Sequence, residues 1–343
     1  MGILPRLVER TGPAVTVQGP TEPLGRSRLV HHPRMDIVEI EPRGPFSLAA
    51  AQDFAGGFPA GIGGGATTAT SLVMAFAVEE PGWAHGAVAE FSQPADGAPV
   101  RVRLVTTGDP GVALAQAVRT VSLDRDGTGW PAVGERDRII GGLQRDYRYL
   151  RPVCFYSAYE AATSFVIGQR IARTQSARIK ARLAELAGDR IDLDGRSFTT
   201  FPRPDRLLEL DDVPGLNAEK MTRLHGLAGA ALDGRLDTER LRGLPTADAL
   251  AELRTLRGIG EFTAEAVLLR GCGIVDEVPK SDTMGPEAVA QLYALDGPPD
   301  AAAYAAVTDG WRPYRMWAVV LVRVGWGRLQ ARPVSYRRDR GRA

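Results

Sequence analysis

Residues 256–264 read Leu-Arg-Gly-Ile-Gly-Glu-Phe-Thr-Ala, and this stretch lies between two predicted helices. Its glycines, Gly258 and Gly260, are one residue apart and allow a turn tight enough to bring the helices close together. The second helix then begins with free backbone N–H groups and the positive end of its dipole. Such a helix start can bind a phosphate without a basic side chain. By itself, the pattern is also compatible with a purely structural helical corner.

Backbone carbonyls of the same turn can point away from the phosphate side. We expect those of Arg254, Leu256 and Ile259 to form a site for a monovalent cation, Na⁺ or K⁺, which would strengthen the attraction for phosphate. No other cofactor is expected. The two cysteines, Cys154 and Cys272, and the four histidines are too few for a zinc or iron–sulfur site.

Length and composition set broad limits on the protein class. The chain has 343 residues, 44% of them hydrophobic, which is enough for about two domains with sizeable cores. No run of about 18 apolar residues occurs, so we expect no membrane span. The first residues contain no apolar h-region, so we expect a cytoplasmic protein without a secretory signal. The net charge of +1 is uninformative, but the arginine-rich end after Arg312 could contact phosphates or form a solvated tail.

The hydrophobic pattern divides the chain into four segments and predicts an α+β protein. Residues 1–34 are rich in Pro and Gly and are predicted to be a poorly ordered extension. Residues 35–145 combine strand-like runs with two helical ones, which predicts a small α+β domain, a sheet with two helices. Residues 146–334 are helical almost throughout and are predicted to form an all-α domain, with the helix-hairpin-helix at about 246–271. Residues 335–343 form a basic tail.

Four motifs occur in a fixed order between about 148 and 330. They are Val166-Ile167-Gly168-Gln169-Arg170, Phe201-Pro202 with Pro204, the Gly-Ile-Gly stretch followed by Val278-Pro279-Lys280-Ser281-Asp282, and Trp311-Arg312-Pro313-Tyr314-Arg315. In this order they resemble the helix-hairpin-helix DNA glycosylase superfamily, most closely the DNA-3-methyladenine glycosylase II family. The strands before residue 145 resemble the extra N-terminal α+β domain of that family more loosely.

The resemblance implies that Asp282 is the catalytic carboxylate. A carboxylate beside C1′ of the sugar stabilises the oxocarbenium cation that forms as the base departs, and it can orient or deprotonate the attacking water. Asp282 is also suited to cap the helix that follows, and the two roles are compatible. Bifunctional members of the superfamily carry a lysine nucleophile where this chain has Phe262. The resemblance therefore implies a monofunctional enzyme that leaves an abasic site.

The target base has to leave the helical stack before it can react. The resemblance implies that Gln169, or its neighbour Ile167, fills the gap in the duplex, although both could be ordinary helix residues. An aromatic wall of Phe262, Trp311 and Tyr314 could stack on an electron-poor base, although each could instead belong to the core.

The hairpin residues are expected to hold the DNA backbone, and these are Gly258, Ile259, Gly260 and Thr263. The expected partner is double-stranded DNA, bound by a monomer.

The resemblance implies a glycosylase for alkylated purines such as 3-methyladenine and 7-methylguanine, acting in base excision repair. Two alternatives stay open: another lesion for the same fold, such as hypoxanthine or uracil, and a non-catalytic helix-hairpin-helix DNA-binding protein. Three departures from the family pattern bear on base preference: Arg257 replaces a proline, Ser281 replaces an aspartate and Ala266 replaces a tyrosine.

Overall fold

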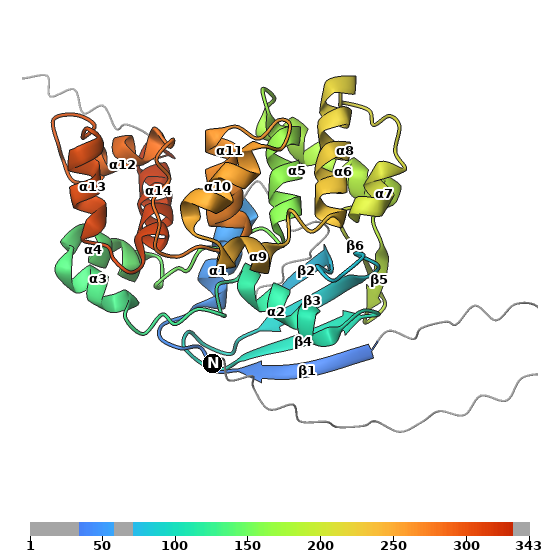
Figure 1. The fold of residues 1–343 in the computed structure, drawn as a ribbon. Coiled ribbons are helices and arrows are strands. Elements are labelled where there is room, and N and C mark those ends of the chain that lie inside the picture. Colours follow the sequence, from blue (N-terminus) through green and yellow to red (C-terminus); the bar gives the residue numbers. More distant parts are fainter. Residues whose placement is uncertain (1–33, 58–70, 332–343) are drawn as a thin grey trace, which may run out of the picture.

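A computed structural model describes residues 34–57 and 71–331 of the chain. Figure 1 shows a four-stranded sheet beneath a larger group of helices, as expected for an α+β protein. The predicted basic tail, and the predicted N-terminal extension apart from Arg34, lie outside the described residues. Among the described helices, none has both the length and the apolar composition that crossing a membrane requires.

The sheet is antiparallel and its strands follow the order β1-β4-β3-β2. The strands are β1 (Arg34–Ile40), β2 (Ser71–Ala77), β3 (Gly86–Ser92) and β4 (Val100–Thr106). Each lies where an alternating or apolar run predicts a strand. Val102 of β4 pairs with Val38 on one side and with Phe91 on the other, so apolar side chains line up across the sheet.

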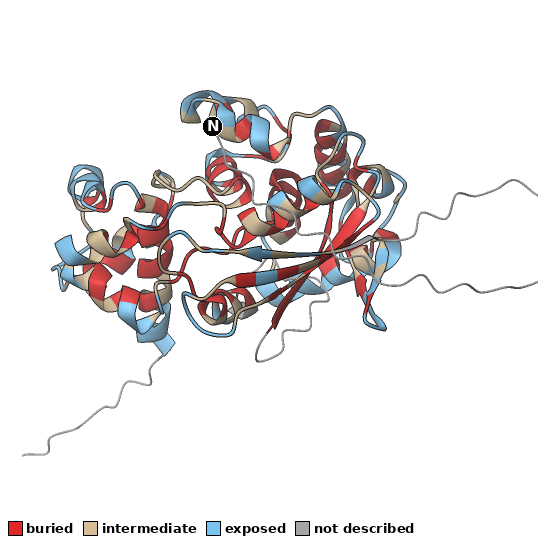
Figure 2. Ribbon diagram, turned by 90° about the horizontal axis from the view of Figure 1, so that it is seen from below, coloured by how far each residue is buried: buried red, intermediate tan, exposed pale blue. Residues whose placement is uncertain are grey.

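Both faces of the sheet are covered over β2 and β3, whereas β1 is partly exposed, as the distribution of buried residues in Figure 2 indicates. On one face, Leu72 and Met74 pack in a core with residues of α1 (Leu48–Gly57) and α2 (Pro110–Thr120). On the other face, Val73 and its neighbours pack against a β-hairpin made of β5 (Arg190–Leu193) and β6 (Arg196–Thr199). This double cover explains why every residue of β2 is buried although β2 is an edge strand.

The hairpin of β5 (Arg190–Leu193) and β6 (Arg196–Thr199) corrects the prediction that residues 146–334 are all helical. Its turn consists of Asp194 and Gly195, which both have positive φ angles, of 51° and 74°. Asp-Gly favours this backbone because two-residue hairpin turns need left-handed conformations that glycine and aspartate tolerate. The signal was therefore present in the sequence.

The remaining described elements are helices that form the upper part of Figure 1. They are α3 (Trp130–Arg136), α4 (Arg138–Asp146), α5 (Ala158–Gly168), α6 (Arg173–Ala187), α7 (Pro204–Leu208), α8 (Ala218–Leu232), α9 (Thr238–Gly243), α10 (Thr246–Arg254), α11 (Glu261–Ala266) with its π-helical continuation η1 (Val267–Gly271), α12 (Met284–Leu292), α13 (Ala301–Asp309) and α14 (Arg315–Ala331). In Figure 1, α10 and α11 lie between a group formed by α12–α14 and a group formed by α5–α8.

Helices α3 and α4 share a core with the C-terminal helices rather than with the sheet. Trp130 and Val133 of α3 and Ile140 of α4 are fully buried in one cluster with Trp317 and Leu321 of α14. Figure 1 accordingly shows α3 and α4 beside α12–α14. These helices come before residue 146 in the sequence, yet they complete the helical part of the molecule.

Candidate active site

The Gly-Ile-Gly turn joins α10 to α11. Gly258 has a φ of 90°, a left-handed conformation that favours glycine, and a Cβ at this position would lie 2.7 Å from Cδ of Arg223. The Ile259 N–H closes the turn by donating to the Leu256 carbonyl at 3.0 Å. Helix α11 then begins at Glu261, and its N-cap residue Gly260 has no side chain to cap the first N–H groups. An anion can therefore bind at this helix start.

The end of α5 is fastened to this turn. Gln169 donates from Nε2 to the Gly258 carbonyl at 2.9 Å, and its Oε1 accepts from Arg223 at 2.8 Å. Lys220 donates to the carbonyls of Ile167, at 2.7 Å, and of Gln169, at 2.8 Å. The Ile167 side chain is fully buried. Neither predicted gap-filling side chain can enter a duplex without leaving these contacts.

The two residues after Glu261 on α11 face in different directions. Phe262 is 51% exposed, and its ring meets that of Phe165 edge-on with the centroids 6.1 Å apart. Thr263 is buried, so any contact it makes with DNA has to come from its backbone. Phe262 is thus the predicted pocket residue that the structure places at the surface.

Asp282 lies just before α12, and its side chain is buried. Its Oδ1 accepts the Met284 N–H at 3.1 Å, so it does contact the start of the following helix. Its Oδ2 accepts from Nη1 of Arg323 on α14 at 2.9 Å. Burial, and next the charge of Asp282, raise the pKa of neighbouring Tyr304 to about 12. The carboxylate is held by the N–H at a helix start and by a guanidinium, and the Tyr304 phenol lies close enough to feel its charge.

Helix α11 connects the hairpin to Asp282 through Glu265. Each Glu265 carboxylate oxygen accepts a backbone N–H at 2.9 Å, one from Lys280 and the other from Ser281. The residue that carries the predicted catalytic carboxylate follows directly. Asp282 therefore lies beside the helix that starts at the glycine turn, as the sequence predicts.

The carbonyls proposed for a monovalent cation lie at the end of α10 and in the turn. Arg254 is the last residue of α10, where helix carbonyls lack intrahelical partners and the dipole is negative. The Leu256 carbonyl accepts one hydrogen bond and keeps a second lone pair. These donors fit a cation that prefers oxygen. Within the described residues, no group of three or more His, Cys, Asp or Glu side chains is placed to bind a metal ion.

Sequence similarity to known proteins covers about half of the chain, whereas structural similarity covers most of it. No protein-family model matches the chain. The chain is 30% identical over 173 residues to DNA-3-methyladenine glycosylase 2 of Escherichia coli, covering 48% of this chain and 56% of that one. It is 25% identical over 201 residues to the DNA-3-methyladenine glycosylase of Bacillus subtilis, covering 57% and 66%. The chain thus spans less than two thirds of the length of either relative.

The structural likeness extends over most of the chain. The 3-methyladenine DNA glycosylase of Archaeoglobus fulgidus matches with a TM-score of 0.68 at 16% identity, over 84% of this chain and 98% of that one. This likeness shows that the chain has the fold of that glycosylase. The 8-oxoguanine glycosylase/lyase of Clostridium acetobutylicum has the same fold, with a TM-score of 0.60 at 16% identity over 85% and 98%.

Two aromatic residues predicted for the pocket lie in the protein core. The Trp311 ring is fully buried, and its Nε1 donates to Asp137 at 3.0 Å. The Tyr314 ring is buried against Trp130, and its hydroxyl donates to the Asp126 carbonyl at 2.8 Å. Their polar atoms are satisfied internally, so we leave both residues out of the proposed base pocket.

Sequence reasoning missed three residues that the glycosylase fold brings to the site. Arg323 pairs with Asp282, and Glu265 holds the preceding loop. Arg170, next to Gln169, is exposed and has a φ of 58° at the end of α5. The exposure of Arg170 could have been anticipated because it is the one charged residue of the motif Val166-Ile167-Gly168-Gln169-Arg170. The other two contacts depend on how distant helices pack.

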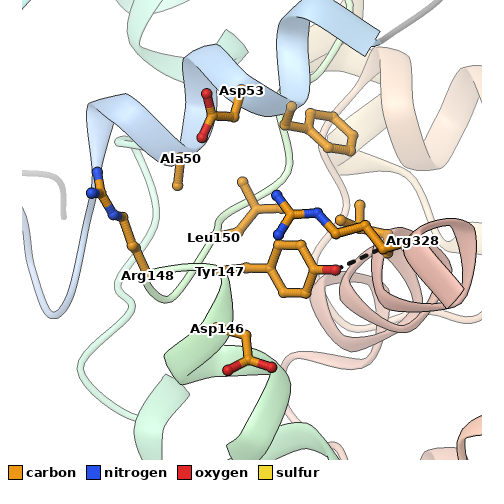
Figure 3. Close-up of a pocket in the computed structure, with 9 residues that line it drawn as sticks. Ala50, Asp53, Asp146, Tyr147, Arg148, Leu150 and Arg328 are labelled. Carbon is orange, nitrogen blue, oxygen red and sulfur yellow. Dashed lines mark hydrogen bonds between the residues drawn. The ribbon is translucent and has the colours of Figure 1, made fainter. Parts of the chain in front are cut away.

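A cavity of about 290 Å³ lies between α1, the end of α4 and α14 (Figure 3). Asp53, Tyr147 and Arg328 are among the residues that line it, and the Arg328 guanidinium lies 4.5 Å from the centre of the Tyr147 ring. None of the residues predicted from the sequence lines this cavity. It neighbours the site only through α14, where Val324 of the lining follows Arg323.

Proposed function

We propose that this protein is a monofunctional DNA glycosylase that hydrolyses the N-glycosidic bond of alkylated purines and leaves an abasic site. The observation that carries the proposal is the buried carboxylate of Asp282, held by Arg323 and the Met284 N–H beside the helix that follows the glycine turn. The names of the matched relatives from E. coli and B. subtilis support the substrate class.

Asp282 supplies the electrostatic part of the proposed mechanism. As the bond to the base breaks, positive charge develops on the sugar, and a fixed carboxylate stabilises it without reorganisation. Arg323 balances the buried charge while no substrate is bound, and the Met284 N–H orients the other oxygen. Asp282 also orients or deprotonates the water that attacks C1′.

Phe262 supports both the monofunctional proposal and a stacking role. A phenyl ring offers no amine at the position where bifunctional members of the superfamily carry lysine, so no Schiff base forms there. Its exposed ring, next to Phe165, can stack on a flipped base, and stacking is strongest on a cationic, electron-poor base. Ala266, one helical turn further along α11, has a small side chain.

The hairpin is the proposed grip on double-stranded DNA. The N–H groups at the start of α11 bind a phosphate, with Gly258, Ile259 and Gly260 shaping the turn and Thr263 contributing through its backbone. A Na⁺ or K⁺ ion on the nearby carbonyls would add positive charge to that grip. The C. acetobutylicum glycosylase of the same fold is described in complex with double-stranded DNA, which supports this partner.

The gap left in the duplex is proposed to be filled by Arg170 rather than by Ile167. Arg170 is exposed just after the end of α5, whereas Ile167 is buried. Gln169 is bonded to the glycine turn, because its Nε2 donates to the Gly258 carbonyl. A guanidinium can both stack on the neighbouring bases and contact phosphate.

We also propose that the enzyme is a monomer, and that it acts in the cytoplasm because its substrate is DNA.

Base release from defined duplexes tests the proposal. The protein is incubated with duplexes carrying 3-methyladenine, 7-methylguanine, hypoxanthine, uracil or 8-oxoguanine, and free base and strand breaks are measured with and without alkali. We expect release of the methylated purines, with strand breaks only after alkali. Release of hypoxanthine or uracil alone would show that the substrate is one of these bases and not an alkylated purine. Binding of DNA without release of any base would favour the non-catalytic DNA-binding alternative.

A further inference from the structure

Glu265 is a buried carboxylate whose hydrogen bonds all go to one short loop segment. Its side chain is on α11, 5% exposed, and it accepts the backbone N–H groups of Lys280 and Ser281 at 2.9 Å each. The Ser281 hydroxyl also donates to Oε2 of Glu265. A carboxylate is an acceptor with several lone pairs, so it satisfies all three donors at once.

The segment that Glu265 holds has no helix or strand of its own. Residues 272–283 contain no regular element between η1 and α12, so the peptide leading into Asp282 is not fixed by a backbone ladder. Charge-assisted hydrogen bonds to backbone N–H groups are among the strong ones. Glu265 thus determines where the chain lies immediately before Asp282, while Arg323 and Met284 determine where the carboxylate points.

Glu265 also lies on the helix that begins at the glycine turn. Phe262 and Glu265 are three residues apart, and residues at this spacing share one face of a helix. A helix is rigid over one turn, so a shift of the α11 start on DNA is transmitted to Glu265 and from there to the loop. The residue at 281 is matched to this arrangement, because an aspartate there would bring a second carboxylate against Glu265, whereas serine donates a hydrogen bond.

We propose that Glu265 is a positioning residue: it ties the DNA-gripping helix to the loop that presents Asp282, and so aligns the carboxylate with the sugar when the hairpin engages the backbone. The inference rests on the proposed glycosylase function. Glu265 does not touch the substrate; it acts through Asp282. Its loss therefore slows base release without weakening the binding of DNA.

Glu265→Gln is the main variant, because it keeps the shape but replaces one acceptor with an amide donor that faces a backbone N–H. Single-turnover release of 7-methylguanine from duplex DNA should slow by about 10- to 100-fold, as expected when a reacting group is misplaced by about 1 Å. The Kd for a duplex with an abasic-site analogue should stay within about 2-fold of wild type, because phosphate binding at the hairpin is unchanged. Glu185→Gln, an exposed residue of α6 with the same change of charge, is the control and should leave rate and affinity unchanged.

Ser281→Asp tests the same contact without altering the core residue. It places a carboxylate against Glu265 and should also slow release. In the double variant Glu265→Gln with Ser281→Asp, the new amide can donate to the new carboxylate, so part of the lost rate should return. Non-additivity of this kind reports a direct interaction. If the rate loss of the double variant equals the product of the two single losses, the proposed contact between residues 265 and 281 is refuted.

Hydrogen exchange gives a readout that does not depend on activity. In Glu265→Gln, amides of residues 278–283 should exchange faster, while α11 and α12 keep their protection. Unchanged exchange together with an unchanged rate would overturn the proposal, and so would a slower rate accompanied by an equal loss of DNA affinity or a general fall in Tm. If wild-type protein releases no base from any duplex, the proposed glycosylase function fails, while the exchange experiment still decides whether Glu265 holds the loop.

Discussion

Gly258→Ala perturbs the turn at its most constrained residue. Gly258 has a φ of 90°, and a residue with a side chain in this backbone region costs about 1–3 kcal/mol. The new Cβ would lie 2.7 Å from Cδ of Arg223, so that side chain has to move. Arg223 bonds to Gln169, which in turn bonds to the Gly258 carbonyl, and moving it loosens the link to α5. We expect a Tm lowered by roughly 2–5 °C.

Gly260→Ala is a matched control two residues away. Gly260 has an ordinary φ of −87°, and a Cβ there would have no atom within 4 Å. Replacing a glycine where alanine fits usually stabilises by about 0.4–1 kcal/mol through the unfolded state. We therefore expect a Tm equal to or slightly above that of wild type.

Thermal unfolding of the two variants, followed by circular dichroism alongside wild type, decides between these expectations. The same proteins are then titrated with duplex DNA at fixed salt, where Gly258→Ala should bind more weakly because the phosphate-binding turn is distorted. Equal Tm values for the two variants would refute the reasoning that Gly258 is required by its left-handed backbone. Unchanged DNA affinity of Gly258→Ala would refute the role of the turn as the phosphate grip.

Three further predictions concern single side chains. Phe262→Ala should leave Tm unchanged but slow single-turnover release about 10-fold through lost stacking, and equal rates would remove Phe262 from the pocket. Arg323→Gln should slow release by about 10-fold at unchanged DNA affinity, because Asp282 loses its ionic partner; a rate equal to wild type would show that the pair is dispensable. Burial raises the pKa of Glu160 to about 8 from 4.5, and Lys180 is the cation that opposes this shift. In the wild type the folded state binds the Glu160 proton more tightly than the unfolded state does, so stability present below pH 4.5 is lost as the pH rises to about 8, by about 1.4 kcal/mol per unit. Lys180→Met removes the cation that lowers this pKa, so the variant should go on losing stability above pH 8, where the wild-type loss levels off. Its Tm deficit against wild type should therefore be constant from pH 5 to pH 8 and widen above pH 8, and a deficit that does not change above pH 8 would contradict this assignment.

The elements with local determinants could be predicted from the sequence. The alternation around Val102 gives β4, and Asp300 caps α13 with a bond to the Ala303 N–H at 2.8 Å. The Asp194-Gly195 turn was also a local signal, but a short hairpin inside a long helical region is easily passed over. The packing of α3 and α4 on α14 has no local signature, because their apolar faces would suit either domain.

The site divides in the same way. The glycine turn and the position of Asp282 after it follow from spacing along the chain. The burial of Trp311 does not, because its partner Asp137 is 174 residues away. The Arg323 contact with Asp282 joins residues 41 apart through the packing of α12 on α14, and no pattern within either helix indicates it. Sequence reasoning therefore predicted a catalytic acid at Asp282 but not the side chains that hold it.

A single comparison of wild type with Asp282→Asn tests whether base release depends on the Asp282 carboxylate. Both proteins are mixed in excess with a 7-methylguanine duplex, and free base is measured over time in parallel with the Kd for the intact duplex. The isosteric amide carries no charge, so we predict that release is lost while DNA binding remains. Release from the amide variant at the wild-type rate would contradict the assignment of Asp282 as the catalytic carboxylate.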